Sequence, residues 1–193
     1  MRSYTDFVAR GADEADEIRR ALQLPRGFNP KARELAQSWA ASIDSGAAIA
    51  EKALSYFREQ GFLYTLEPPL LGRHSVDEFL FDSKQGFCEH YASSFVFLLR
   101  AAGVPARVVT GYQGGEINPV DGYMIVRQSD AHAWAEVWLG GRGWVRFDPT
   151  AAASPVRLES GVGAAVPATD PLPLMARTTL RWLLEARYNW DAL

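Results

Sequence analysis

Apolar residues recur at intervals of three and four along the first sixty positions, which is the spacing of amphipathic helices. The pattern predicts three helices, and a proline or glycine follows each one. The second helix is expected to take Asn29 as its N-cap and Pro30 as its first residue. The predicted ranges are 13–24, 30–39 and 47–60, and we interpret these helices as a scaffold.

The pattern changes after Gly61. An apolar, aromatic run at 62–66 predicts a short strand, and 76–81 predicts a short helical turn. A loop then leads to Cys88, after which apolar residues return at helical spacing until Gly103 and Pro105 end the run. Cys88 is therefore expected in the first turn of a long helix.

Residues rich in β-branched and aromatic side chains follow that helix and predict four strands. Their expected ranges are 106–112, 123–128, 131–139 and 143–148. Because the helices precede the strands in the chain, we expect an α+β fold in which the helix that carries Cys88 packs on an antiparallel meander.

The organisation of the chain follows from these elements. We expect an N-terminal helical segment (1–46), a core (47–150), a linker or strap rich in proline, alanine and glycine (151–174) and a C-terminal helix (175–193). The abrupt start and the aromatic, helical finish are what a domain of a longer protein would show.

Composition excludes several classes of function. The chain has 193 residues, of which 48% are apolar, and a net charge of -3 without a run of lysine or arginine, so nucleic acid is not an expected partner. No apolar stretch reaches the ~18 residues that span a bilayer, so the chain itself is expected to be soluble. A single cysteine and three scattered histidines argue against a metal site, and we expect no cofactor.

Cys88 is the first candidate for chemistry. A helix start stabilises a thiolate because unpaired backbone N–H groups and the macrodipole favour negative charge there. Taken alone, a free cysteine is more often a small buried apolar residue. Partners elsewhere in the chain must therefore support a role as nucleophile.

His132 and Asp148 can supply those partners. A histidine can deprotonate the thiol, and a carboxylate can orient the imidazole and stabilise its cation. His132 lies between small alanines in the third predicted strand, and Asp148 ends the fourth. The ordinary alternatives are a strand histidine bonded to backbone and an aspartate that caps a turn.

The register of the last hairpin decides whether these side chains meet. If Trp138 pairs with Trp144, Asp148 lies diagonal to His132 on the same face. A tight turn at Gly140 and Gly141 would instead send the two side chains to opposite faces. The strand pattern leaves both registers open.

The two other histidines are weaker bases. His90 is two residues from Cys88 in the same helix, and residues i and i+2 do not face each other. His74 lies in an irregular loop, so we give neither residue the role of base.

Four ordered segments resemble the transglutaminase-like superfamily. They are GFCEHYA at 86–92, AGVPARVVTGY at 102–112, HAWAEVW at 132–138 and WVRFDPT at 144–150. The resemblance covers roughly residues 50–155 and is strongest to bacterial members in which this domain is the extracytoplasmic, periplasmic part of an inner-membrane protein. It implies a papain-like cysteine acyltransferase fold, with membrane attachment through flanking segments only.

The resemblance also implies a site and a reaction. The family's triad falls on Cys88, His132 and Asp148, with a glutamine-bearing protein or peptide as acyl donor and an amine as acceptor. The backbone N–H of Cys88 is the expected oxyanion donor. Eukaryotic relatives use an upstream tryptophan as a second donor, but none lies between Trp39 and Cys88, so Tyr64 and Trp134 become the candidates for a cleft wall or second donor. The calcium dependence of the eukaryotic enzymes is not carried over to this chain, because no acidic loop in the sequence has calcium-ligand spacing.

Three functions remain open from the sequence. The leading hypothesis is protein-glutamine acyltransfer through a thioester. The second keeps the triad but uses water, or acts on cell-wall peptide, as a peptidase or amidase. The third is a non-catalytic module that binds a peptide or peptidoglycan.

Overall fold

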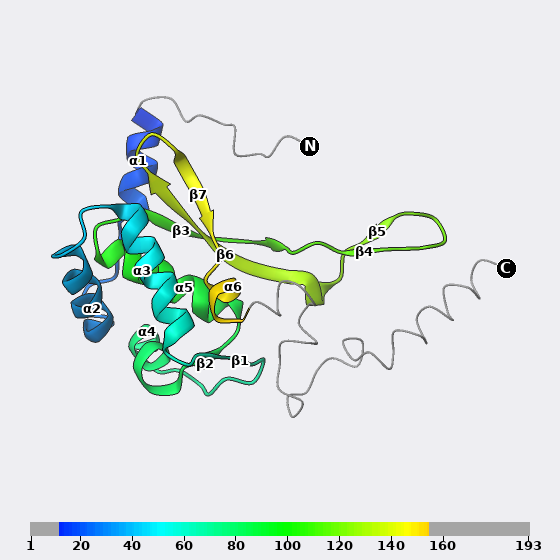
Figure 1. The fold of residues 1–193 in the computed structure, drawn as a ribbon, viewed down its shortest axis with the longest axis horizontal. Coiled ribbons are helices and arrows are strands. Elements are labelled where there is room, and N and C mark those ends of the chain that lie inside the picture. The colour runs from blue at the N-terminus through cyan, green and yellow to red at the C-terminus, as the bar shows by residue number, and fades with distance from the viewer. Residues whose placement is uncertain (1–11, 155–193) are drawn as a thin grey trace.

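The computed structural model describes residues 12–154, with α5 (Cys88–Ala101) at their centre. One side of α5 packs against a sheet, and α2 (Pro30–Ala40) and α3 (Gly46–Glu59) pack around it as well (Figure 1). From residue 94 to residue 99 every side chain of α5 is buried. A helix that is covered on all sides belongs to the interior, so α5 is the axis of the fold.

The sheet contains three antiparallel strands in the order β3 (Ala106–Tyr112), β6 (Ala131–Leu139) and β7 (Gly143–Phe147). The α+β class and the helix-on-sheet arrangement are confirmed. The four-stranded meander is wrong at its second strand, because β3 pairs directly with β6 over seven consecutive residue pairs. This ladder occupies the edge of β3 that the strand at 123–128 would have needed.

The segment between β3 and β6 forms a separate ribbon instead. β4 (Glu116–Ile117) pairs with β5 (Met124–Ile125), and the ribbon projects from the body of the molecule (Figure 1). Its apolar side chains stay in solvent, with Tyr123 74% exposed. The predicted strand thus forms a short ribbon outside the sheet, because β3 pairs directly with β6 and leaves no position between them.

Short elements complete the described chain. They are α1 (Ala12–Arg20), β1 (Leu63–Tyr64), α4 (Ser75–Asp77), the π-helix η2 (Glu78–Ser83), β2 (Gln85–Gly86), the 3-10 helix η3 (Gln128–Asp130) and α6 (Pro149–Ala153). The predicted linker begins inside α6, so its first residues, 151–153, are helical. The rest of the linker and the predicted C-terminal helix lie outside the described residues. Between residues 12 and 154 no helix combines the length and the apolar character needed to cross a bilayer.

An aromatic cluster fixes the base of α5. Tyr91 lies 5.7 Å from Phe57 and 5.2 Å from Phe79 between ring centroids, and Phe62 lies 5.2 Å from Phe79. All four rings are buried. Since burial of one such side chain contributes about 1.5–3 kcal/mol, this cluster holds the first turn of α5 against the segment that leads into it.

Asn29 occupies the N-cap position of α2 and Pro30 is its first residue, as predicted, but the Asn29 side chain makes no capping hydrogen bond to α2. Asn29 adopts a left-handed conformation with φ 52°, and its side-chain oxygen accepts from the N–H groups of Val76 and Asp77 in α4. The buried Asp77 in turn accepts from Lys31 N–H at 3.0 Å and Ala32 N–H at 2.8 Å. Each residue therefore caps the other's helix, because tertiary packing brings the two helix starts together.

Replacement of Asp77 is expected to destabilise the domain. Asp77→Ala removes the acceptor of two N–H groups at the start of α2, one buried and one part-buried, so we expect a loss of about 1–3 kcal/mol in the free energy of unfolding. Urea unfolding measures the loss. The control is Asp44→Ala, an exposed position, where a change within about 0.5 kcal/mol is expected. Equal effects of the two variants would contradict the reciprocal-cap interpretation.

Candidate active site

Cys88 occupies the first position of α5, as predicted, and is partly exposed. The segment before it is held on β1, where Leu63 N–H donates to Lys84 C=O and Thr65 N–H donates to Gly86 C=O, both at 2.9 Å. A Cβ on Gly86 would lie 2.7 Å from the Cβ of His90, so only glycine fits there. Close backbone packing thus sets the position at which the thiol emerges.

His132 lies near the start of β6, and its side chain has no exposed surface. Nε2 lies 2.8 Å from Asp148 Oδ2. The buried Nδ1 has no nitrogen or oxygen partner among the described residues, and the Cys88 side chain lines the same cavity as the imidazole. Burial acts to lower the pKa of His132, but hydrogen bonds and charge from Asp148 and Cys88 outweigh it and raise the pKa above its ordinary value.

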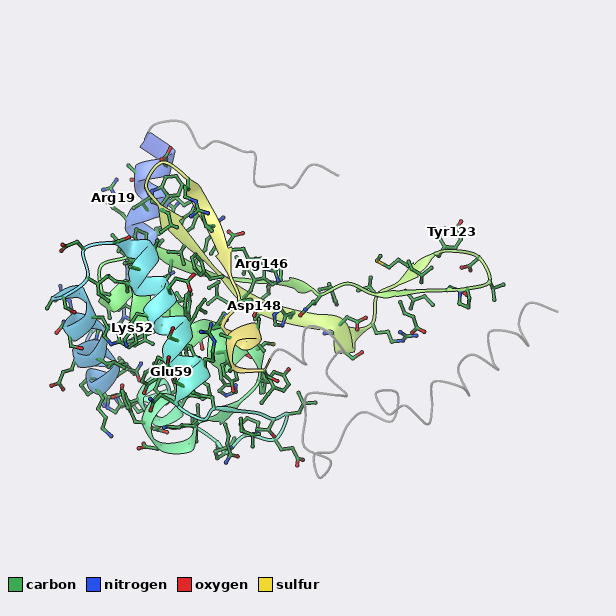
Figure 2. The ribbon with its side chains drawn as sticks, in the orientation of Figure 1. Arg19, Lys52, Glu59, Tyr123, Arg146 and Asp148 are labelled. Carbon is green, nitrogen blue, oxygen red and sulfur yellow. The ribbon has the colours of Figure 1, made fainter. Side chains whose placement is uncertain are left out.

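Asp148 has two tasks at once. Its Oδ1 accepts from Ala151 N–H at 3.3 Å and caps α6, while its Oδ2 faces both His132 and Arg146 Nη2, the latter at 3.3 Å. Burial would raise the pKa of Asp148, but these partners, His132 first, lower it below its ordinary value. The turn-capping aspartate and the partner of the histidine are therefore the same residue. Figure 2 shows Arg146 and Asp148 close together.

The hairpin between β6 and β7 has the register that brings these side chains together. Trp138 pairs with Trp144 and Leu139 with Gly143, so residues 140–142 form the turn. Gly141 and Gly143 have φ values of 78° and 73°, a conformation that favours glycine. The tight two-residue turn is thereby excluded.

Trp134 lies behind His132 and is absent from the lining of the cavity described below. Its ring stacks on the imidazole with centroids 6.1 Å apart, and the Arg146 guanidinium lies 4.3 Å from its centroid. A Cβ on Gly111 would come within 2.8 Å of the indole. Trp134 thus packs against the imidazole and against Arg146, a different place from the cleft wall or donor position that was expected.

A cavity of about 500 Å³ joins the thiol and the imidazole. Tyr64, buried within β1, is among the residues that line it. The sequence analysis did not single out the other residues that line the cavity. Two of them, Val108 and Thr110, share a face of β3 because side chains alternate along a strand. The others include Leu66, Glu89, Ser93, Gln128 and Ser129. A cavity of about 510 Å³ at the opposite end of α5 is lined by neither cysteine nor histidine.

The other two histidines have structural partners. His90 Nδ1 faces the N–H of Phe87 at 3.4 Å, and burial lowers the pKa of His90 despite the adjacent charge of Glu89. His74 Nδ1 accepts from Asn29 N–H at 3.1 Å. Across residues 12–154 no three histidine, cysteine or acidic side chains gather in a way that could hold a metal ion.

The chain belongs to the transglutaminase-like superfamily, whose family model matches residues 33–149. It is 46% identical over 180 residues to the protein-glutamine gamma-glutamyltransferase of Pseudomonas aeruginosa. The aligned region covers 90% of this chain and 27% of that relative. It is 33% identical over 150 residues to YebA of Bacillus subtilis, covering 74% of this chain and 20% of that protein. The chain thus spans about a quarter of the length of these curated relatives.

A solved structure supports the same fold. The crystal structure of the periplasmic domain of TgpA from Pseudomonas aeruginosa superimposes with a TM-score of 0.77 at 46% identity, over 80% of this chain and 54% of that one. The predicted family and fold class are confirmed by these similarities.

Proposed function

We propose that this chain is a protein-glutamine acyltransferase of the transglutaminase type. The observation that carries the proposal is the buried His132, held by Asp148 on one ring nitrogen and open to Cys88 on the other. This is the arrangement that a cysteine nucleophile requires. The name of the Pseudomonas aeruginosa relative indicates the same reaction.

The proposed reaction has two halves. The Cys88 thiolate attacks the side-chain carboxamide carbon of a glutamine, and the C–N bond breaks as His132 gives its proton to the leaving ammonia. An amine then attacks the Cys88 thioester and loses a proton to His132, and the C–S bond breaks to release the Cys88 thiolate as the new amide forms. The raised pKa of His132 favours the imidazolium, the form that donates to ammonia in the first half and forms again in the second.

The oxyanion of each half needs preorganised donors. The backbone N–H of Cys88 lies at the start of a helix, where the first N–H groups have no carbonyl within the helix. Tyr64 lines the same cavity, and we assign its hydroxyl as the candidate second donor.

Transfer and hydrolysis share the thioester and differ in the acceptor. Incubation with a glutamine donor peptide and a tagged primary amine separates them. Incorporation of the tag that is lost in Cys88→Ala supports the transferase. Ammonia release or cleavage without incorporation supports the amidase or peptidase, and binding without any turnover supports a peptide or peptidoglycan module.

We propose a compartment and partners for this chain by analogy with its relatives. The solved relative is described as a periplasmic domain, and we assign this chain to the same compartment, with attachment to the inner membrane through segments outside it. Its expected partners are a glutamine-bearing protein or peptide and a primary amine, and cell-wall peptides are candidates for either role.

The thiol of Cys88 is expected to react at unusually low pH. Because the imidazolium of His132 and the start of α5 both favour the thiolate, alkylation by iodoacetamide should persist well below pH ~8.5, the ordinary thiol pKa. The rate of alkylation measured from pH 5 to pH 9 tests this. In His132→Gln the profile should move towards that of a free thiol. A profile that His132→Gln leaves unchanged would sink the proposed triad.

A further inference from the structure

The outer edge of β3 has unused backbone hydrogen-bonding groups. Ala106 directs its N–H away from β6 to Ala21 C=O at 3.1 Å, and its C=O accepts from Arg100 Nε on that side at 2.8 Å. In an antiparallel strand, alternate residues direct their N–H and C=O to the same side. Val108, Thr110 and Tyr112 therefore present these groups along the edge opposite β6.

Within the described residues no backbone group pairs with this edge beyond Ala106. Val108 is 41% exposed and Tyr112 is 54% exposed. Proteins normally protect such an edge with charge, proline or a bulge, yet residues 108–112 contain none of these. An open, uncharged edge is a template for an added strand.

This edge runs beside the candidate active site. Val108 and Thr110 line the cavity that contains Cys88 and His132. Figure 1 shows β3 leading from the body of the molecule towards the β4–β5 ribbon. A chain laid along β3 would pass the mouth of the cavity.

We infer that the outer edge of β3 binds an extended segment of the acyl-donor polypeptide as an added strand and thereby delivers its glutamine to Cys88. This inference rests on the proposed function. The occupant is a peptide backbone because only it repeats donors and acceptors every second residue, at about 7 Å, to match Val108, Thr110 and Tyr112. Alternate side chains of that peptide face the cavity, and the glutamine is one of them.

Backbone N-methylation of the donor tests the inference without altering the protein. A fluorescent peptide with a central glutamine is methylated at one backbone nitrogen at a time, and its binding to the full chain carrying Cys88→Ala is measured by anisotropy. Affinity should fall about tenfold at every second position and change little at those between, because each bond to the edge contributes on the order of a tenfold factor. Uniform or random effects would overturn the added strand.

A protein variant provides the matched test. Val108→Pro removes an edge N–H without touching the ladder to β6, whereas Val108→Ala shortens the same side chain and keeps the N–H. The ratio of kcat/KM for the long peptide to that for a blocked single glutamine should fall about tenfold in Val108→Pro and not in Val108→Ala. An equal ratio in both variants contradicts the inference.

Two outcomes separate this inference from its alternatives. Ammonia release from the blocked single glutamine reports on the proposed function alone, so its absence would refute that function while the anisotropy still tests the edge. Sedimentation of the full chain that shows a stable dimer blocking peptide binding would assign the edge to a second copy and overturn the inference.

Discussion

Cys88→Ala is expected to abolish both ammonia release from a glutamine donor and incorporation of an amine. Every bond change in the proposed reaction passes through the thiolate, so we expect a loss of about 10⁴-fold or more in kcat/KM, as for other removed nucleophiles. A coupled ammonia assay and a tagged-amine assay measure the two losses.

The fold should survive this substitution. Cys88 is only partly buried, and the aromatic cluster below it stays intact. The expected shift in the thermal unfolding midpoint is small, and Ser38→Ala on the exposed side of α2 is the activity control. Donor turnover that persists in Cys88→Ala would place the chemistry elsewhere in the molecule.

Asp148→Asn is expected to remove most of the activity while the fold remains. Asparagine still caps α6, because it is a good N-cap residue, but it cannot hold the imidazolium of His132 by charge. In a serine protease the corresponding carboxylate-to-amide change lowers kcat by about 10⁴-fold, and we expect a loss of about 10²–10⁴-fold here. Asp148→Ala should additionally lose about 1 kcal/mol of stability with the cap.

The pH dependence distinguishes a positioning role from a merely structural one. Asp148 raises the pKa of His132, so in Asp148→Asn this pKa should fall. Proton donation to ammonia needs the imidazolium, and the alkaline limb of the pH–rate profile should therefore move to lower pH. A limb that stays in place while activity falls would show that the carboxylate acts only through the cap.

The free energy of unfolding should depend on pH through the same two groups, Asp148 and His132. The lowered pKa of Asp148 contributes stability above its ordinary value of 3.8, which is lost as pH falls through its folded value. The raised pKa of His132 contributes stability below 6.5, which is lost as pH rises through its folded value. The difference in unfolding free energy between the wild type and Asp148→Asn should thus be largest from about pH 4 to pH 6.5.

Local sequence signals predicted the elements that carry the chemistry. Helical spacing after Cys88 and alternation around His132 placed both residues where the structure has them. Arg146 shares a strand face with Asp148, so its contact with that carboxylate was within reach of the same reasoning. The sequence predicted a helical turn at 76–81, but it gave no signal that residues 78–83 would form a π-helix, in which Phe79 packs against Tyr91.

Residue order and spacing alone established that a cysteine opens a helix and that a histidine and an aspartate follow on strands, since these features depend on neighbours within a few positions. Tertiary structure decided everything that joins distant segments. It set the register of β6 with β7, gave Asn29 and Asp77 each other's helix to cap and kept 123–128 out of the three-stranded sheet. Among the described residues it also left the outer edge of β3 without a backbone partner beyond Ala106. The reason is physical: hydrogen bonds and packing between segments outweigh the small free-energy differences that local preference sets.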